Sequence, residues 1–146
     1  MNDSGTYALV IAVRDTLDLE IGRLGYFSLK PGYYIYVGSA LGGLSGRLKR
    51  YMSAAKKIHW HIDYLMQSAA IEQVWFSLSQ DRLECTWNDI VTTLPGAQLA
   101  VPGFGASDCR CRSHLTCYPR MPRFKLFEQR TRQSGLPKVH LIDLTF

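Results

Sequence analysis

Two tyrosines, an arginine and a glutamate are spaced along the chain so that they could act together on a phosphodiester: Tyr7, Tyr36, Arg47 and Glu84. Hydrolysis of a phosphodiester requires a positioned water, positive charge against the phosphate and help for the leaving oxygen. The planar guanidinium of Arg47 could grip the phosphate, because it carries several donors and stays protonated. Glu84 could hold Mg²⁺ or Mn²⁺, since magnesium is often bound by one or two carboxylates plus substrate phosphate.

The two phenols would position or deprotonate the attacking water. A phenol with an ordinary pKa of about 10 is a poor base at neutral pH, so deprotonation requires the metal and Arg47 to lower that pKa. Gly38 lacks a Cβ and would let the backbone approach a phosphate closely. His59 would carry a proton near the same cleft, and Asp63, four residues later on a helix, could pair with it. Taken singly, these residue types are more typical of structural positions, so the prediction rests on their combination.

The charge of the chain indicates a class of partner. It has 146 residues and a net charge of +5, from 17 lysines and arginines against 12 acidic residues. The excess is concentrated at 47–57 and 110–132, where aromatic residues are interleaved. Such stretches suit a phosphate-rich partner, DNA or RNA, although many proteins with this net charge bind no nucleic acid. We predict that these residues bind the substrate: Gly38, Ser39, Lys49, Arg50 and Tyr51.

The elements that position these residues are predicted from apolar periodicity and turn residues. Strands are predicted at 7–13, 21–30, 33–37 and 74–78, with an edge strand at 139–144. Pro31-Gly32 would join the second and third strands into an extended hairpin. A helix after Gly42-Gly43 would bury Leu44, Leu48 and Met52, a second would span 58–66, and a third would follow Ser79 as its cap. The helical pattern is weak beyond Pro95.

Placed on these elements, two tripeptides resemble those of the GIY-YIG nuclease superfamily: Gly5-Thr6-Tyr7 and Tyr36-Val37-Gly38. Arg47 follows on the next helix and Glu84 on a later one, and the segments 36–40 and 47–51 resemble phage intron-homing nucleases. Three longer stretches, 31–40, 59–65 and 103–111, resemble the compact prokaryotic Uri-type endonucleases. One tripeptide alone is a weak signal, whereas the longer stretches are specific for this branch. The superfamily resemblance covers roughly residues 5–95, and the narrower one extends to about 115.

The resemblance implies an α+β fold with a central, mainly antiparallel three-stranded sheet flanked by helices, an extended hairpin and a basic C-terminal extension. It also implies a metal-dependent endonuclease acting on DNA, with Glu84 as the metal ligand and catalytic roles for Tyr7, Tyr36 and Arg47. The sequence departs from the superfamily pattern in three ways. The tyrosines lie 29 residues apart, Ser39 stands where many relatives carry lysine, and Asn88 lies too soon after Glu84 to match the late asparagine of DNA-repair relatives.

The chain has four cysteines, Cys85, Cys109, Cys111 and Cys117. They do not require a disulfide framework in a chain of this size. Cys109, Cys111, His114 and Cys117 are residue types that bind zinc, but a single residue between the first two is tighter than the usual spacing. Structural thiols are therefore favoured over a zinc site.

We predict one domain over residues 1–146, with a nuclease core at about 5–95 and a Cys/His and basic extension at about 96–146. No apolar run approaches the roughly 20 residues of a membrane-spanning helix, and the N-terminus lacks a signal-peptide pattern. We therefore expect a cytoplasmic protein with no membrane partner. Without a separate specificity domain, it would be structure-selective, weakly specific or targeted by a protein partner.

Two other functions remain open at this point. One is a nucleic-acid-binding module with a weak or silent site on the same scaffold. The other is a zinc-stabilised interaction domain built on Cys109, Cys111, His114 and Cys117.

Overall fold

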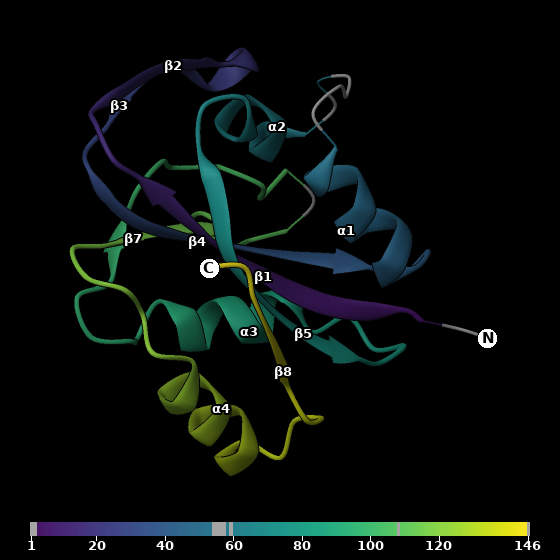
Figure 1. Ribbon diagram of the computed structural model, residues 1–146. Coiled ribbons are helices and arrows are strands. Elements are labelled where there is room, and N and C mark those ends of the chain that lie inside the picture. Colours follow the sequence, from purple (N-terminus) through teal and green to yellow (C-terminus); the bar gives the residue numbers. More distant parts are fainter. Residues whose placement is uncertain (1–2, 54–57, 59, 108, 146) are drawn as a thin grey trace.

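The computed structural model describes residues 3–53, 58, 60–107 and 109–145 (Figure 1). Its main element is a six-stranded sheet in the order β6-β7-β4-β1-β5-β8, in which every described pairing is antiparallel. The strands of this sheet are β1 (Gly5–Val13), β4 (Gly32–Ala40), β5 (Ala70–Leu78), β6 (Gln98–Leu99), β7 (Leu115–Tyr118) and β8 (His140–Asp143). The helices are α1 (Leu44–Met52), α2 (His61–Met66), α3 (Glu84–Val91) and α4 (Phe124–Gln133).

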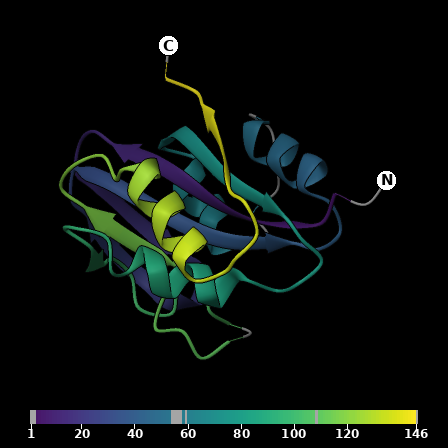
Figure 2. The same cartoon turned by 90° about the horizontal axis from the view of Figure 1, so that it is seen from below.

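The central strand β1 is buried on both faces of the sheet. Successive side chains of a strand point to opposite faces, so Tyr7 and Leu9 lie in one core with α1 and α2, while Ala8 and Val10 lie in another with α3 and α4. Figures 1 and 2 show the two pairs of helices on opposite faces of the sheet. This double burial explains why residues 7–13 are almost continuously apolar.

The α+β class is confirmed, but the prediction of a three-stranded sheet is wrong. The predicted strand 21–30 is also wrong: the segment contains the end of β2 (Leu17–Ile21), a 3-10 turn (Gly22–Leu24) and β3 (Gly25–Leu29). β2 and β3 pair with each other in a separate ribbon, and β4 pairs with β1 over nine residues rather than with β3. Local turn residues at Pro31-Gly32 therefore did not determine which strands pair.

The helix predictions are confirmed in position and corrected in detail. α1 begins at Leu44 as predicted, but Met52 is 49% exposed and Tyr51 takes its place in the core. The second helix begins at His61 rather than residue 58. α3 begins at Glu84 with Leu83 as its N-cap, and the Ser79 hydroxyl instead accepts a hydrogen bond from the Asp81 amide.

The C-terminal third contributes elements that the sequence pattern did not predict. β7 extends the sheet beside β4, and α4 packs Phe127 against Trp87 of α3 at 4.9 Å between ring centroids. The predicted edge strand is confirmed as β8, which pairs with β5. No helix in the described part of the chain is long and apolar enough to cross a membrane.

Candidate functional site

A small polar cavity of about 200 Å³ lies where β4 extends past the end of β7. The pairing of β4 with β7 ends at Tyr36 and Leu115, whereas β4 continues to Ala40. Beyond Tyr36, side chains from both faces of the sheet can therefore approach this edge of β4, as Arg47 of α1 and Glu84 of α3 do. The cavity is lined by Tyr36, Gly38, Ser39, Arg47, Trp60, Arg82, Glu84, Gly105 and Cys109. Three of the predicted catalytic residues, Tyr36, Arg47 and Glu84, therefore share one cavity.

Arg47 is held at the cavity wall by β1 and β4. Its guanidinium donates hydrogen bonds to the Tyr7 hydroxyl at 3.3 Å and to the Ser39 carbonyl at 3.2 Å. Burial lowers the pKa of Arg47, but its interactions with Tyr7 and Tyr51 outweigh this and raise it, so the side chain remains a cation. Arg47 makes no ion pair with an acidic residue in the part of the chain that the structure describes. Its positive charge is thus available to an anion in the cavity.

Tyr7 does not line the cavity, but it connects Arg47 to the core. Its hydroxyl lies 2.5 Å from that of Tyr51, and its ring is fully buried between those of Tyr36 and Tyr51. Burial raises the pKa of Tyr7 far above its ordinary value, and the neighbouring Tyr36 raises it further, against the lowering effects of Tyr51 and Arg47. Tyr7 is therefore a neutral hydrogen-bonding group that positions Arg47.

Tyr36 is also kept neutral. Burial raises its pKa most, Tyr51 and Glu84 raise it further, and Arg47 only partly opposes them. The sequence argument required Arg47 and a metal to lower the pKa of both phenols. Within the protein alone the net shift is upward, because desolvation of a phenolate outweighs the neighbouring cation. Both phenols are therefore neutral at neutral pH, and each can donate a hydrogen bond.

Gly38 is small for a reason that the sequence did not indicate. A Cβ built on Gly38 would lie 2.5 Å from Cζ of Tyr7 and closer still to its hydroxyl. The missing side chain therefore makes room for the Tyr7 ring, its cross-strand partner. Gly38 does line the cavity, but the reason that a glycine is needed there is the packing of the Tyr7 ring against it.

The remaining predicted substrate-binding residues separate into different environments. Arg50 donates two hydrogen bonds to the fully buried carboxylate of Asp63, at 2.8 and 2.9 Å. Tyr51 is buried, and Lys49 is exposed on α1. Ser39 lines the cavity, and its carbonyl accepts a hydrogen bond from Arg47.

Trp60 and Asp63 hold the two arginines of α1 that lie beside the cavity. The guanidinium carbons of Arg47 and Arg50 lie 4.4 and 4.3 Å from the Trp60 ring centroid, within cation–π range. The Asp63 carboxylate also accepts a hydrogen bond from the Trp60 amide. Both oxygens of the Asp63 carboxylate therefore accept hydrogen bonds, from Arg50 and from the Trp60 amide. His59, its predicted partner and a predicted catalytic residue, lies outside the described residues.

Glu84 reaches the cavity because it is the first residue of α3, the helix that packs on the other face of the sheet. Among the lining residues that the structure describes, Glu84 is the one carboxylate, and the exposed Arg82 lies just before the helix. Sequence reasoning missed Arg82, since an exposed arginine outside any predicted element carries no periodic signal.

The loop between β6 and β7 closes the other side of the cavity. Gly105 has a φ of +65°, and a Cβ there would lie 2.8 Å from Cε1 of Tyr36. Its amide donates to Nδ1 of His61 at 2.8 Å, and Phe104 packs against both Tyr36 and His61. His61 is thus a hydrogen-bonded structural histidine.

A cluster of thiols and one imidazole adjoins the cavity. One ligand atom from each of Cys85, Cys109, Cys111 and His114 lies within 4.8 Å of the others, so this group could hold a metal ion. The prediction that Cys117 completes the set is wrong: Cys117 lies in β7, buried in the core on the face of α1 and α2. Cys85, at the start of α3, takes that place.

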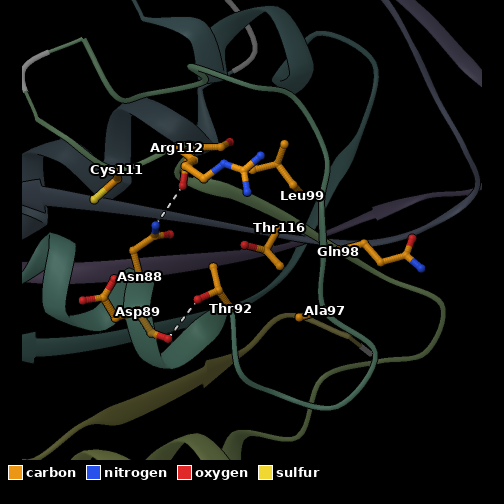
Figure 3. Close-up of a pocket in the computed structure, with 10 residues that line it drawn as sticks. Asn88, Asp89, Thr92, Ala97, Gln98, Leu99, Cys111, Arg112 and Thr116 are labelled. Carbon is orange, nitrogen blue, oxygen red and sulfur yellow. Dashed lines mark hydrogen bonds between the residues drawn. The ribbon is translucent and has the colours of Figure 1, made fainter.

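A second cavity of about 310 Å³ lies between α3 and the segment around β6 (Figure 3). Asn88 and Thr92 of α3 line it, and the Asn88 amide donates to the Ser113 carbonyl at 2.8 Å. Although it is larger, none of the predicted catalytic residues that the structure describes lines it. The smaller cavity remains the candidate site because Tyr36, Arg47 and Glu84 line it together.

The two basic stretches include helices on opposite faces of the sheet. Residues 47–53 belong to α1 and its C-terminal end, whereas the second stretch runs from the segment before β7 into α4. In α4, Arg130 donates to the Thr93 carbonyl and hydroxyl, which fixes it against the end of α3. Among the described residues of the two stretches, Arg47 lines the candidate cavity.

Comparison with known proteins identifies the family. The domain family described as "Domain of unknown function DUF123" matches residues 6–135, nearly the whole chain. The chain belongs to the DUF123 family. No curated protein and no solved structure matches it. The DUF123 match includes every described residue that lines the candidate cavity and all four members of the thiol–imidazole cluster.

Proposed function

We propose that this DUF123 protein is a metal-dependent endonuclease of the GIY-YIG type, which hydrolyses phosphodiester bonds of DNA at the cavity beside β4. The observation that carries the proposal is the shared cavity of Tyr36, Arg47 and Glu84, with Tyr7 hydrogen-bonded to Arg47. These residues come from β4, α1, α3 and β1, so their convergence requires the whole fold.

Arg47 would bind the scissile phosphate. It is a cation without an acidic partner among the described residues, whereas its neighbour Arg50 is paired with Asp63. Hydrogen bonds to Tyr7 and to the Ser39 carbonyl orient its guanidinium, so little conformational freedom is lost when a phosphate binds. Arg82 adds a second positive charge at the cavity.

The Tyr36 hydroxyl would position the attacking water. Its raised pKa keeps it protonated, so it can both donate a hydrogen bond and accept one. Tyr7 would act as a positioning residue for Arg47, because its hydroxyl is shared between Arg47 and Tyr51.

The donor set of the cavity fits a hard divalent cation at Glu84. One carboxylate in a polar cavity is enough for Mg²⁺ or Mn²⁺, since magnesium keeps several waters and takes further ligands from substrate phosphate. Glu84 would hold the ion. When bound, such an ion stabilises the charge that develops on the phosphate and the leaving oxygen.

The test is cleavage of branched, nicked and single-stranded DNA by the purified protein in Mg²⁺ or Mn²⁺. We expect cleavage by the natural chain and its loss in Arg47→Ala. The matched control is Arg14→Ala, which should change cleavage little, because Arg14 is exposed just beyond the opposite end of β1. If all three substrates remain uncut, the proposal is wrong. Binding that weakens steeply with salt, without cleavage and without dependence on metal or Glu84, would favour the nucleic-acid-binding module instead.

A further inference from the structure

We propose that Cys85, Cys109, Cys111 and His114 bind one structural zinc ion, a site separate from the divalent cation proposed at Glu84. In a tetrahedral zinc site with Zn–S bonds of about 2.3 Å, the ligand atoms lie roughly 3.5–4 Å apart. Here the four ligand atoms lie within 4.8 Å of one another. Nε2 of His114 is 3.2 Å from Sγ of Cys109 and 3.9 Å from Sγ of Cys85. The side chains are therefore already close to the required arrangement.

The other nitrogen of His114 has a partner that suits a zinc ligand. Nδ1 lies 3.1 Å from the carbonyl oxygen of Val37, which can only accept a hydrogen bond. Nδ1 therefore carries the proton, and the lone pair of Nε2 faces the three sulfur atoms. Zinc-binding histidines commonly donate their second ring nitrogen to a carbonyl or carboxylate, which fixes the ring and its tautomer. His114 is completely buried, so its ring orientation is set by the fold.

The composition of the cluster points to zinc and to a structural role. Three thiolates and an imidazole are soft ligands, which select zinc over magnesium or calcium. Four protein ligands complete a tetrahedron and leave no position for substrate, as in structural rather than catalytic zinc sites. All four cysteines are free thiols in the structure, so no disulfide competes for these sulfur atoms.

The position of the cluster explains what the zinc would do. Cys109, Cys111 and His114 come from the segment 100–114, whose described residues form no helix or strand. Connections of this length are uncommon without a function or a constraint. Cys85 stands in the first turn of α3, and Asn88, one turn later, holds the same segment through the Ser113 carbonyl. The ion would thus fasten the segment that carries Gly105 to the helix end that carries Glu84.

The first test is metal analysis of the intact chain, purified without chelators from zinc-supplemented medium. We expect one zinc per chain. After removal of zinc, titration with Co²⁺ should produce the visible absorption bands of tetrahedral thiolate coordination, saturating at one equivalent and disappearing when zinc is added. Absence of zinc together with absence of these bands would overturn the proposal, as would spectra of six-coordinate cobalt.

Matched variants identify the ligands. Cys85→Ser should lose the stoichiometric zinc, whereas Cys117→Ser should retain it, because Cys117 is a thiol of the same chain that lies in the core away from the cluster. Glu84→Gln should also retain zinc, which separates this site from the one proposed for the endonuclease. Zinc retained in Cys85→Ser, or lost in Cys117→Ser with its fold intact, would show that the ligand set is wrong. Because metal content is measured directly, the result does not depend on whether the chain cleaves DNA.

Discussion

The packing of Tyr7 against Gly38 gives a prediction that tests the site geometry without any activity assay. In Gly38→Ala the new methyl group would lie 2.5 Å from Cζ of Tyr7, and the fully buried ring has no open space to enter. Overpacking of a core typically costs about 1–3 kcal/mol, and we expect this loss in the free energy of unfolding measured in urea. The displaced ring would also disturb the hydroxyl contacts with Tyr51 and Arg47.

A double-mutant cycle separates this clash from a general intolerance of alanine in β4. Tyr7→Phe keeps the ring atoms that meet the methyl group, so Gly38→Ala should remain about as costly in that background. Tyr7→Leu removes those atoms, so the cost should fall to near zero, which gives a coupling of about 1–3 kcal/mol. The matched control is Gly46→Ala on α1, where a Cβ meets nothing within 4 Å and should stabilise by about 0.5–1 kcal/mol. Equal costs for Gly38→Ala in the Phe and Leu backgrounds would refute the reasoning.

Three further outcomes are expected. Asp63→Asn should lower the free energy of unfolding by about 2–4 kcal/mol, because it breaks the buried ion pair with Arg50. Lys49→Ala, at an exposed position, should change it by less than about 0.5 kcal/mol. If urea unfolding gave similar losses for the two variants, the ion pair would be contradicted. Burial raises the pKa of Tyr7 above its value of 10.0, so this tyrosine stabilises the fold fully below pH 10, and the contribution is lost as pH rises toward the folded-state pKa. At pH 11 the free energy of unfolding should be lower by about 1.4 kcal/mol because of Tyr7 alone. Unfolding curves of Tyr7→Phe should therefore show a smaller loss of stability between pH 9 and 11 than those of the natural chain. A strong zinc chelator should lower the Tm of the natural chain, with recovery on adding zinc, since metal binding is coupled to folding; an unchanged Tm in calorimetry would oppose the zinc site.

Local sequence patterns predicted the elements that carry the candidate site. The apolar run at 7–13, the glycine pair before α1 and the helical spacing of Leu44 and Leu48 each reflect a single segment and its burial. The same patterns placed Arg47 and Glu84 on helices, and these residues lie in α1 and α3.

Features that depend on pairing between distant segments could not be predicted in this way. Whether β4 pairs with β3 or β1 depends on which partner buries more surface, and the turn at Pro31-Gly32 allows both. Cys85 was missed because it lies far in sequence from Cys109 and Cys111, with no spacing motif between them. Cys117 was chosen wrongly because residues 115–118 were not predicted to be a strand, and the strand turns its side chain into the core.

The pKa values of the tyrosines are a second example. The sequence places an arginine near two phenols, which by itself would lower their pKa. It does not show that Tyr7 and Tyr36 are almost wholly buried, and burial dominates. The direction of these pKa shifts therefore could not be predicted without the three-dimensional structure.

The most direct test of the proposed endonuclease is the single-turnover rate of Mg²⁺-dependent DNA cleavage by Glu84→Gln. This change removes the charge of the one carboxylate found among the described residues that line the cavity, while keeping the shape of the side chain. The account predicts a fall of about 100-fold or more, with Glu20→Gln on the exposed face of β2 cleaving at the natural rate. Cleavage by Glu84→Gln at the rate of the natural chain would contradict it.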